Sequence, residues 1–142
     1  MSKKKQDDGK NRPFSTALVG LKKKLEEVTV TDPDKTKLDA PAADGTVRLV
    51  YPYDRTMFAR GLFAPELMWN ANTAGDVCAV TFKEDFFEAT AYVTGAQPGR
   101  WLLNAAIWEG ITASNHGEDV YVNIACLAGG VASSAGETTW RV

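Results

Sequence analysis

Alternating apolar and polar positions recur along the chain from residue 46 onward, and this period of two is typical of β-strands with one buried face. Within 46–51, for example, Val47, Leu49 and Tyr51 share one side of the segment. Gly, Pro, Asn and Asp separate the alternating segments, as expected for turns. The pattern predicts strands over 46–51, 62–70, 76–83, 86–94, 120–127 and 138–142, with Pro65 marking an edge position or a bulge in the second.

One segment within this region follows helical spacing instead. Trp101, Ala105, Trp108 and Ile111 recur at intervals of four, three and three residues, which predicts a helix over 101–114 with both tryptophans on one face. The run Ser114-Asn115-His116-Gly117 provides a stop signal. Six short strands separated by turns, with one inserted helix, are the pattern of a mainly β protein built as an antiparallel, immunoglobulin-like β-sandwich.

The N-terminal part of the chain has a different organisation. Residues 1–13 are charged and without periodicity, and they are expected to be disordered. Ser15 is a candidate N-cap, and Leu18, Leu21 and Leu25 predict a short amphipathic helix that ends near residue 27. Residues 28–45 are rich in turn-forming residues. The predicted organisation is therefore a basic flexible arm with a short helix over 1–27, a linker over 28–45 and a β-sandwich domain over 46–142.

Charge is distributed unevenly along the 142 residues. The formal net charge is only −2. Residues 1–24, however, carry eight Lys and Arg residues against two Asp residues, and the remainder carries eight against sixteen acidic residues. A basic arm on an acidic body can bind nucleic acid or an acidic protein, or it can simply keep the tail solvated. The candidate electrostatic residues are Lys3, Lys4, Lys5, Lys10, Arg12, Lys22, Lys23 and Lys24.

The cellular compartment is predicted from the presence or absence of two features, a secretory signal near residue 1 and apolar runs long enough to cross a membrane. Residues 1–13 do not have the pattern of a secretory signal, and we find no apolar run near the ~20 residues of a membrane span. As it stands, the sequence predicts a cytoplasmic protein without a membrane span. A chain that has lost its export signal would change the prediction to a secreted protein.

The two cysteines lie in different apolar runs and do not have the spacing of a zinc or redox site. Cys78 shares a face with Val80 and Phe82, and Cys126 shares a face with Val122 and Ile124. Two buried free thiols are the expected state, and one disulfide between strands is the alternative in an oxidising compartment.

We find no complete catalytic or metal-binding motif. The single histidine, His116, is expected in a surface turn, and no Gly-x-Ser-x-Gly nucleophile motif accompanies it. Asp32, Asp34 and Asp39 do not match a calcium loop, because Pro33 follows the first aspartate. The carboxylates Glu84, Asp85 and Glu88 are expected in a solvated turn. The chain is therefore predicted not to be an enzyme and to need no cofactor.

Aromatic residues are the strongest remaining functional signal. Most are expected in the core of a small sandwich, but aromatic side chains exposed together would form a platform for a sugar or for a partner's apolar surface. The candidate contact residues are Tyr51, Tyr53, Phe58 and Trp101.

Several short motifs are distributed over residues 48–142. They are Val50-Tyr51-Pro52-Tyr53-Asp54, Phe58-Ala59-Arg60-Gly61-Leu62, Ala64-Pro65, Met68-Trp69, Ile107-Trp108-Glu109, Ser114-Asn115-His116-Gly117, Val120-Tyr121-Val122 and Thr139-Trp140-Arg141-Val142. Together they resemble a β-sandwich domain of large secreted lipoproteins of myxobacteria and related bacteria, where the domain precedes a Tol-type β-propeller. The resemblance implies a β-sandwich and a secreted or cell-surface location.

These observations favour a non-catalytic binding or assembly module. It would contact a protein partner, or other copies of itself, through strand edges or the aromatic residues. The alternative is a protein that associates with nucleic acid through the Lys-rich arm.

Overall fold

The computed structural model describes residues 21–71 and 75–142. Within these residues the chain forms two β-sheets and two helices. In chain order the elements are β1 (Leu21–Glu26), α2 (Asp32–Asp39), β2 (Val47–Tyr51), β3 (Thr56–Met57), β4 (Glu66–Ala71), β5 (Val77–Lys83), β6 (Phe87–Thr94), β7 (Gly99–Leu102), α3 (Ala105–Ser114), β8 (Val120–Ala128) and β9 (Val131–Arg141).

The larger sheet has the strand order β1-β6-β5-β8-β9-β3. Its four central strands pair antiparallel, and the two outer strands, β1 and β3, pair parallel with their neighbours. The central strands have many Val, Ile, Ala and Phe residues, which suit a sheet that is covered on both faces.

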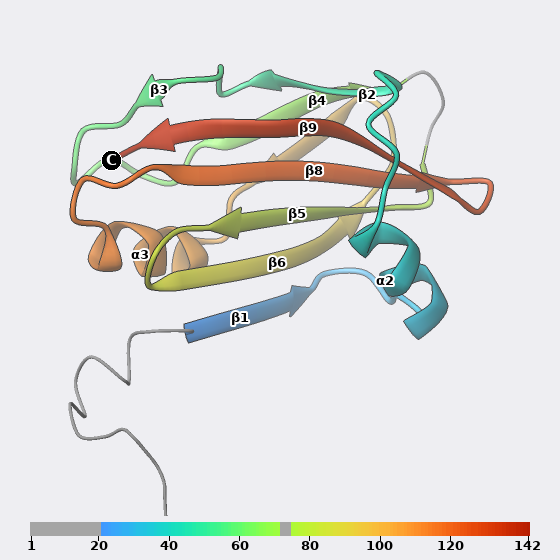
Figure 1. Ribbon diagram of the computed structural model, residues 1–142, viewed down its shortest axis with the longest axis horizontal. Coiled ribbons are helices and arrows are strands. Elements are labelled where there is room, and N and C mark those ends of the chain that lie inside the picture. Colours follow the sequence, from blue (N-terminus) through green and yellow to red (C-terminus); the bar gives the residue numbers. More distant parts are fainter. Residues whose placement is uncertain (1–20, 72–74) are drawn as a thin grey trace, which may run out of the picture.

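The smaller sheet has the order β2-β4-β7, and both of its strand pairs are antiparallel. It packs on one face of the larger sheet (Figure 1). Trp69 of β4 and Phe82 of β5 are fully buried in the core between the two sheets. Gly99 of β7 allows this packing, because a Cβ there would overlap the indole of Trp69. The fold is mainly β and is a β-sandwich, as the sequence predicted.

The predicted strands over 46–51, 76–83, 86–94 and 120–127 correspond closely to β2, β5, β6 and β8. The predicted strand over 62–70 forms only from Glu66, because residues 62–65 follow Gly61, whose positive φ interrupts an extended chain, and belong to a loop. The strand predicted over 138–142 is the end of the much longer β9. The short strands β3 and β7 were not predicted.

The helix predicted over 15–27 is wrong for the residues that the structure describes. Residues 21–26 form β1, which pairs parallel with β6 from Leu21 opposite Phe87 to Glu26 opposite Tyr92. An interval of four residues, as between Leu21 and Leu25, returns to the same face of a strand as well as of a helix. The predicted residues 15–20 lie outside the described part of the chain.

The linker predicted over 28–45, with turn-forming residues, contains a helix that was not predicted, because residues 32–39 form α2. Thr31 caps this helix by accepting a hydrogen bond from Asp34 N at 3.3 Å, and Pro33 occupies its first turn. The same Asp-Pro-Asp sequence is typical of turns, which explains the error. Leu38 is buried with Val30 and Tyr92 against the outer face of the larger sheet. Figure 1 shows α2 and α3 near opposite ends of the sandwich.

The helix predicted over 101–114 is shorter than expected. Asn104 caps α3 by accepting hydrogen bonds from Ala106 N and Ile107 N, so the helix begins at residue 105. Trp101 belongs to β7, and only Trp108 lies on the helix. The two tryptophans therefore do not share a helical face, although both are buried in the same core.

The outer edge of β9 is covered by irregular chain rather than by a full strand. Ala42 N–H donates to the carbonyl of Ala132, and Ser134 N–H donates to the carbonyl of Ala42. Further along, the N–H groups of Arg55 and Phe58 donate to carbonyls near the end of β9. At the opposite edge of the sheet, β1 presents Lys22, Lys23 and Lys24, and lysine on an edge strand discourages pairing with another chain. Both edges of the larger sheet are thus protected.

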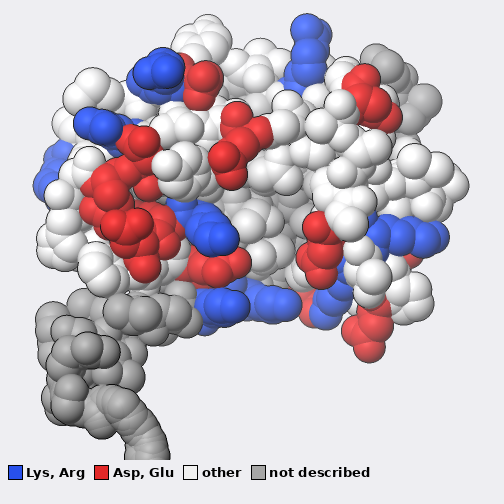
Figure 2. All heavy atoms as spheres, viewed as in Figure 1, with Lys and Arg blue, Asp and Glu red and all other residues white. Residues whose placement is uncertain are grey.

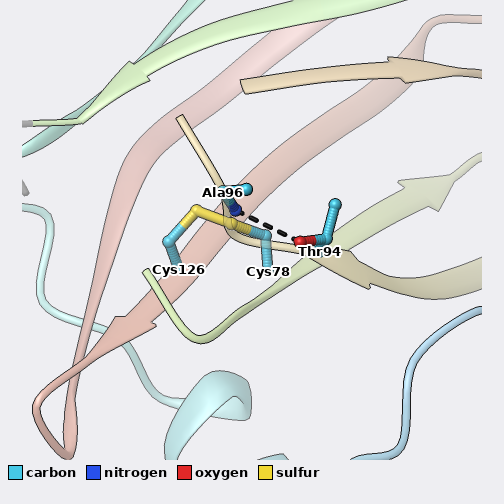
Figure 3. The surroundings of a disulfide bond; sticks show 4 residues. All are labelled: Cys78, Thr94, Ala96 and Cys126. Atoms are coloured by element: carbon cyan, nitrogen blue, oxygen red, sulfur yellow. Dashed lines mark hydrogen bonds between the residues drawn. A yellow bond between two sulfur atoms is a disulfide. The ribbon is translucent and has the colours of Figure 1, made fainter. Parts of the chain in front are cut away.

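Cys78 and Cys126 form a disulfide bond between the adjacent strands β5 and β8 (Figure 3). The predicted pair of free thiols is therefore wrong, and the alternative of a bond between strands is correct. Both cysteines lie on the face that packs against the smaller sheet, together with Val80 and Phe82, as their alternation predicted. They occupy directly opposite positions of the antiparallel pair, which the sequence alone did not specify.

Reduction of this disulfide is expected to lower the free energy of unfolding by about 2–4 kcal/mol, because the bond constrains a loop of 48 residues in the unfolded chain. Urea unfolding with and without a thiol reductant measures the difference. The double variant Cys78→Ala and Cys126→Ala is the control and should not respond to the reductant. Equal unfolding midpoints for the oxidised and reduced native chain would contradict this prediction.

Candidate functional site

The segment that joins β2 to β4, residues 52–65, crosses from the smaller sheet to the edge of the larger one and back, and we call it the connector (Figure 1). It contains only the two-residue strand β3, which pairs with Trp140 and Arg141 of β9. The rest is irregular, but it is fixed by hydrogen bonds and packing along its length. Loops held on a rigid scaffold in this way are common binding surfaces.

Phe58 anchors the middle of the connector. Its ring packs edge-on against Trp108 of α3 and Trp140 of β9, each at 5.3 Å between ring centroids. Its backbone N–H donates to the carbonyl of Arg141 at 2.8 Å. Aromatic pairs in this arrangement contribute about 0.5–1.5 kcal/mol beyond the area that they bury. Phe58 therefore ties the connector to both the helix and the larger sheet.

The second half of the connector is held against α3 by two side chains. The guanidinium of Arg60 donates to the carbonyls of Thr112 and Asn115 at the end of the helix, at 2.8 and 2.5 Å. These carbonyls have no partner within a helix, so a cation there is favourable. From the helix, Trp108 Nε1–H donates to the carbonyl of Leu62 at 2.9 Å. The backbone at the tip of the connector, beside Leu62 and Phe63, is thus held against α3.

Apolar side chains on and beside the connector remain exposed to solvent. Phe63 is 96% exposed and Met57 is 78% exposed. Six of the nine exposed large apolar residues in the described part of the chain lie within residues 50–63, so the exposure is concentrated on one segment. We call these six residues the connector surface: Val50, Tyr51, Tyr53, Met57, Leu62 and Phe63.

The structure separates the four aromatic residues that were candidates for a contact surface. Tyr51 and Tyr53 are exposed, and their rings pack edge to face at 5.8 Å. Phe58 is partly buried as described above. Trp101 is only 7% exposed, and its Nε1–H donates to Glu27 Oε2 at 3.0 Å. Two of the four therefore lie together on the connector surface, and the other two are structural.

Sequence reasoning missed Leu62 and Phe63, because it assigned them to a strand that would bury alternate residues. The signals that mark a loop are Gly61, which has φ +86°, and Pro65. A positive φ strongly favours glycine and interrupts a strand. Neither residue indicates which side chains stay exposed, because that depends on the docking of the connector on α3.

The structure describes three of the eight candidate electrostatic residues. Lys22, Lys23 and Lys24 are exposed on β1. Figure 2 shows basic side chains along the lower edge of the molecule, where β1 lies in Figure 1. The remaining candidates, Lys3, Lys4, Lys5, Lys10 and Arg12, lie outside the described residues.

Glu84 corrects the prediction of a solvated carboxylate cluster. It lies in the turn between β5 and β6 but is only 8% exposed. Its carboxylate accepts hydrogen bonds from the hydroxyl of Ser114 and from Asn115 Nδ2, both at the end of α3. Asn115 also receives Arg60 at its carbonyl, so Glu84 supports the helix end to which the connector is attached.

Burial raises the pKa of the Glu84 carboxyl, and nearby Glu118 and Asp85 raise this pKa further, while the hydrogen bonds from Ser114 and Asn115 oppose the shift. Figure 2 shows acidic side chains gathered near the end of the sandwich where α3 lies. Glu118 Oε2 is buried without a hydrogen-bond partner among the described residues, and its Oε1 accepts from the backbone N–H of His116. His116 is exposed in the turn after α3, where the sequence placed it.

Within residues 21–71 and 75–142, no group of three or more His, Cys, Asp and Glu side chains has an arrangement that could hold a metal ion. No helix among the described residues combines the length and apolar character needed to cross a membrane. No protein-family model, curated protein or solved structure matches this chain.

The variant Glu84→Gln is expected to weaken the pH dependence of stability. Because the pKa of Glu84 is raised in the folded protein, the unfolded chain loses this proton first as pH rises. The carboxyl therefore contributes stability at acidic pH that is lost as pH rises through the folded-state pKa. Relative to the native chain, Glu84→Gln should become more stable between acidic and neutral pH, as measured by urea unfolding.

The exposed Glu109→Gln on α3 is the matched control for the loss of one negative charge. If Glu84→Gln and the native chain differ by the same free energy at every pH, then burial of Glu84 does not alter its ionisation.

Proposed function

We propose that this chain is a non-catalytic binding and assembly module, which contacts a protein partner, including further copies of itself, through the connector surface. The observation that carries this proposal is the exposure of Leu62 and Phe63 on a loop that Arg60 and Trp108 hold in place. A rigid apolar tip loses little conformational entropy on binding. Aromatic side chains in such positions often supply much of the energy of an interface.

The disulfide supports a location outside the reducing cytoplasm. Bonds between cysteines persist mainly in secreted and cell-surface proteins, because cytosolic thiols are kept reduced. We therefore propose a secreted or cell-surface module rather than the cytoplasmic protein predicted from the sequence as it stands. This proposed location agrees with the resemblance to a domain of secreted lipoproteins.

The double variant Leu62→Ser and Phe63→Ser is expected to abolish self-association while leaving stability within about 0.5 kcal/mol, since both side chains are exposed. Size-exclusion chromatography with light scattering, over a concentration series, measures the assembly state of the oxidised full chain. Val131→Ser, which changes an exposed apolar residue at the start of β9, at the opposite end of that strand from its pairing with β3, is the matched control.

If the native chain remains monomeric at millimolar concentration, self-association through the connector surface is wrong. The same conclusion follows if the double variant associates as strongly as the native chain. An N-terminal deletion for this experiment should begin at Leu21, because a later start would remove β1 from the larger sheet.

A second candidate function is binding of nucleic acid through the basic residues. The observation that favours it is the exposure of the consecutive residues Lys22, Lys23 and Lys24 along the edge strand β1. Replacing these three lysines by Gln is expected to reduce the dependence of log K on log salt by about 0.9 for each phosphate of duplex DNA that the lysines neutralise. Fluorescence anisotropy with a labelled duplex over a salt series measures this slope.

Lys83→Gln, at an exposed position at the end of β5, is the control for loss of a single positive charge elsewhere. Absence of duplex binding at low salt by the native chain would exclude this candidate. An unchanged salt slope in the triple variant would show that β1 does not contact phosphate.

A further inference from the structure

A cleft of about 430 Å³ opens at the end of the larger sheet where the connector meets β8 and β9. Segments far apart in the sequence converge here: the turn before β3, the residue before β8 and the end of β9. The volume lies within the range of small-molecule sites. The residues that line the cleft are Asp54, Arg55, Met57, Asp119, Thr139 and Arg141.

Hydrogen bonds inside the protein use only part of the polar groups in the cleft. Arg141 Nε–H donates to Asp119 Oδ1 at 2.7 Å, and Thr139 N–H donates to Asp54 Oδ1 at 2.9 Å. These bonds fix the orientation of the side chains. The second oxygen of each aspartate and the terminal nitrogens of Arg141 have no partner among the described residues. The cleft therefore offers both donors and acceptors to a ligand.

Arg55 occupies a backbone conformation that is unfavourable for an arginine. Its φ is 67°, and this left-handed region costs a non-glycine residue about 1–2 kcal/mol. The conformation is held by Arg55 N–H, which donates to the carbonyl of Thr139 at 2.7 Å, and by Thr56 N–H, which donates to the carbonyl of Tyr53. Backbone strain of this kind is concentrated at functional sites. Here it is found at a residue whose side chain lines the cleft.

The charges in the cleft indicate the class of ligand. Two arginines and two aspartates balance, so a simple anion or cation would meet a like charge beside each opposite one. A hydroxyl group both donates and accepts, and adjacent hydroxyls on one ring match alternating guanidinium and carboxylate groups. Met57 adds an exposed apolar wall, and Tyr53, which is 69% exposed, begins the turn that carries Asp54 and Arg55. The apolar face of a sugar ring can pack against side chains such as Met57 and Tyr53.

We propose that this cleft binds a neutral saccharide through Arg55, Arg141, Asp54 and Asp119. The cleft shares Met57 with the connector surface, but it is separate from Leu62 and Phe63, which carry the proposed protein contact and lie on the α3 side of the connector. The module would thus recognise a glycan at one end of the connector and a protein at the other.

The experiment is a screen of the oxidised full chain against an array of neutral oligosaccharides of glucose, galactose, mannose and N-acetylglucosamine, followed by calorimetry with the strongest one. Binding is expected for the native chain. Arg55→Gly should weaken it about tenfold or more, because the variant removes a charge-assisted hydrogen bond. Glycine adopts the positive φ of residue 55 readily, so this variant tests the side chain without disturbing the turn.

Arg141→Gln should weaken binding by a similar factor, and the exposed Arg48→Gln on β2, outside the cleft, should bind as the native chain does. Leu62→Ser with Phe63→Ser should also retain binding, which distinguishes this site from the protein contact. The proposal is overturned if no neutral oligosaccharide binds, if only sialylated or sulfated glycans bind, or if binding survives in the Arg55→Gly, Arg141→Gln double variant.

Discussion

The packing of Phe58 against Trp108 and Trp140 is the interaction on which the proposed binding surfaces of this protein depend. One side chain here joins the connector, α3 and the end of β9, and backbone pairing with β9 and the hydrogen bonds of Arg60 and Trp108 reinforce the same junction. Because the ring of Phe58 packs inward against Trp108 and Trp140, the backbone of the connector on either side of Phe58 lies at the surface. Side chains there, including Met57 and Phe63, are exposed to solvent. The proposed protein contact and the proposed saccharide cleft lie on either side of this anchor.

A second constraint is that each sheet edge must be paired, covered or protected. The edge of β9 is covered by Ala42 and by the connector, whose backbone groups from Arg55 to Phe58 replace a neighbouring strand. The connector therefore has a structural role in addition to the proposed functional one. Because the backbone of the connector is hydrogen-bonded to β9, its side chains face the cleft in one fixed arrangement. Such an arrangement favours binding, since the protein need not reorganise to receive a ligand.

The buried Glu84 connects the turn between β5 and β6 with the end of α3, to which the connector is attached. Its carboxylate holds Ser114 and Asn115, and the carbonyl of Asn115 receives Arg60 from the connector. Removal of one partner from such a network leaves a buried polar group without a hydrogen bond, which is costly. The sequence placed Glu84 in a charged turn, which is correct for the backbone. It did not reveal that the end of α3 covers this turn.

Alternating apolar positions and short apolar runs rich in β-branched and aromatic residues were enough to predict the main strands, because both patterns are typical of strands with one or two buried faces. These patterns therefore identified β2, β5, β6 and β8, the mainly β class and the shared faces of the two cysteines. The pairing of Leu25 in β1, the burial of Trp101 in β7 and the exposure of Phe63 on the connector became clear only in the folded structure. Each of these depends on a neighbour distant in the sequence. Leu25 pairs with β6, Trp101 donates to Glu27, and Trp108 holds the loop that carries Phe63 through the carbonyl of Leu62. A local pattern records burial along one segment, but pairing partners and exposed surface are properties of how separate segments meet.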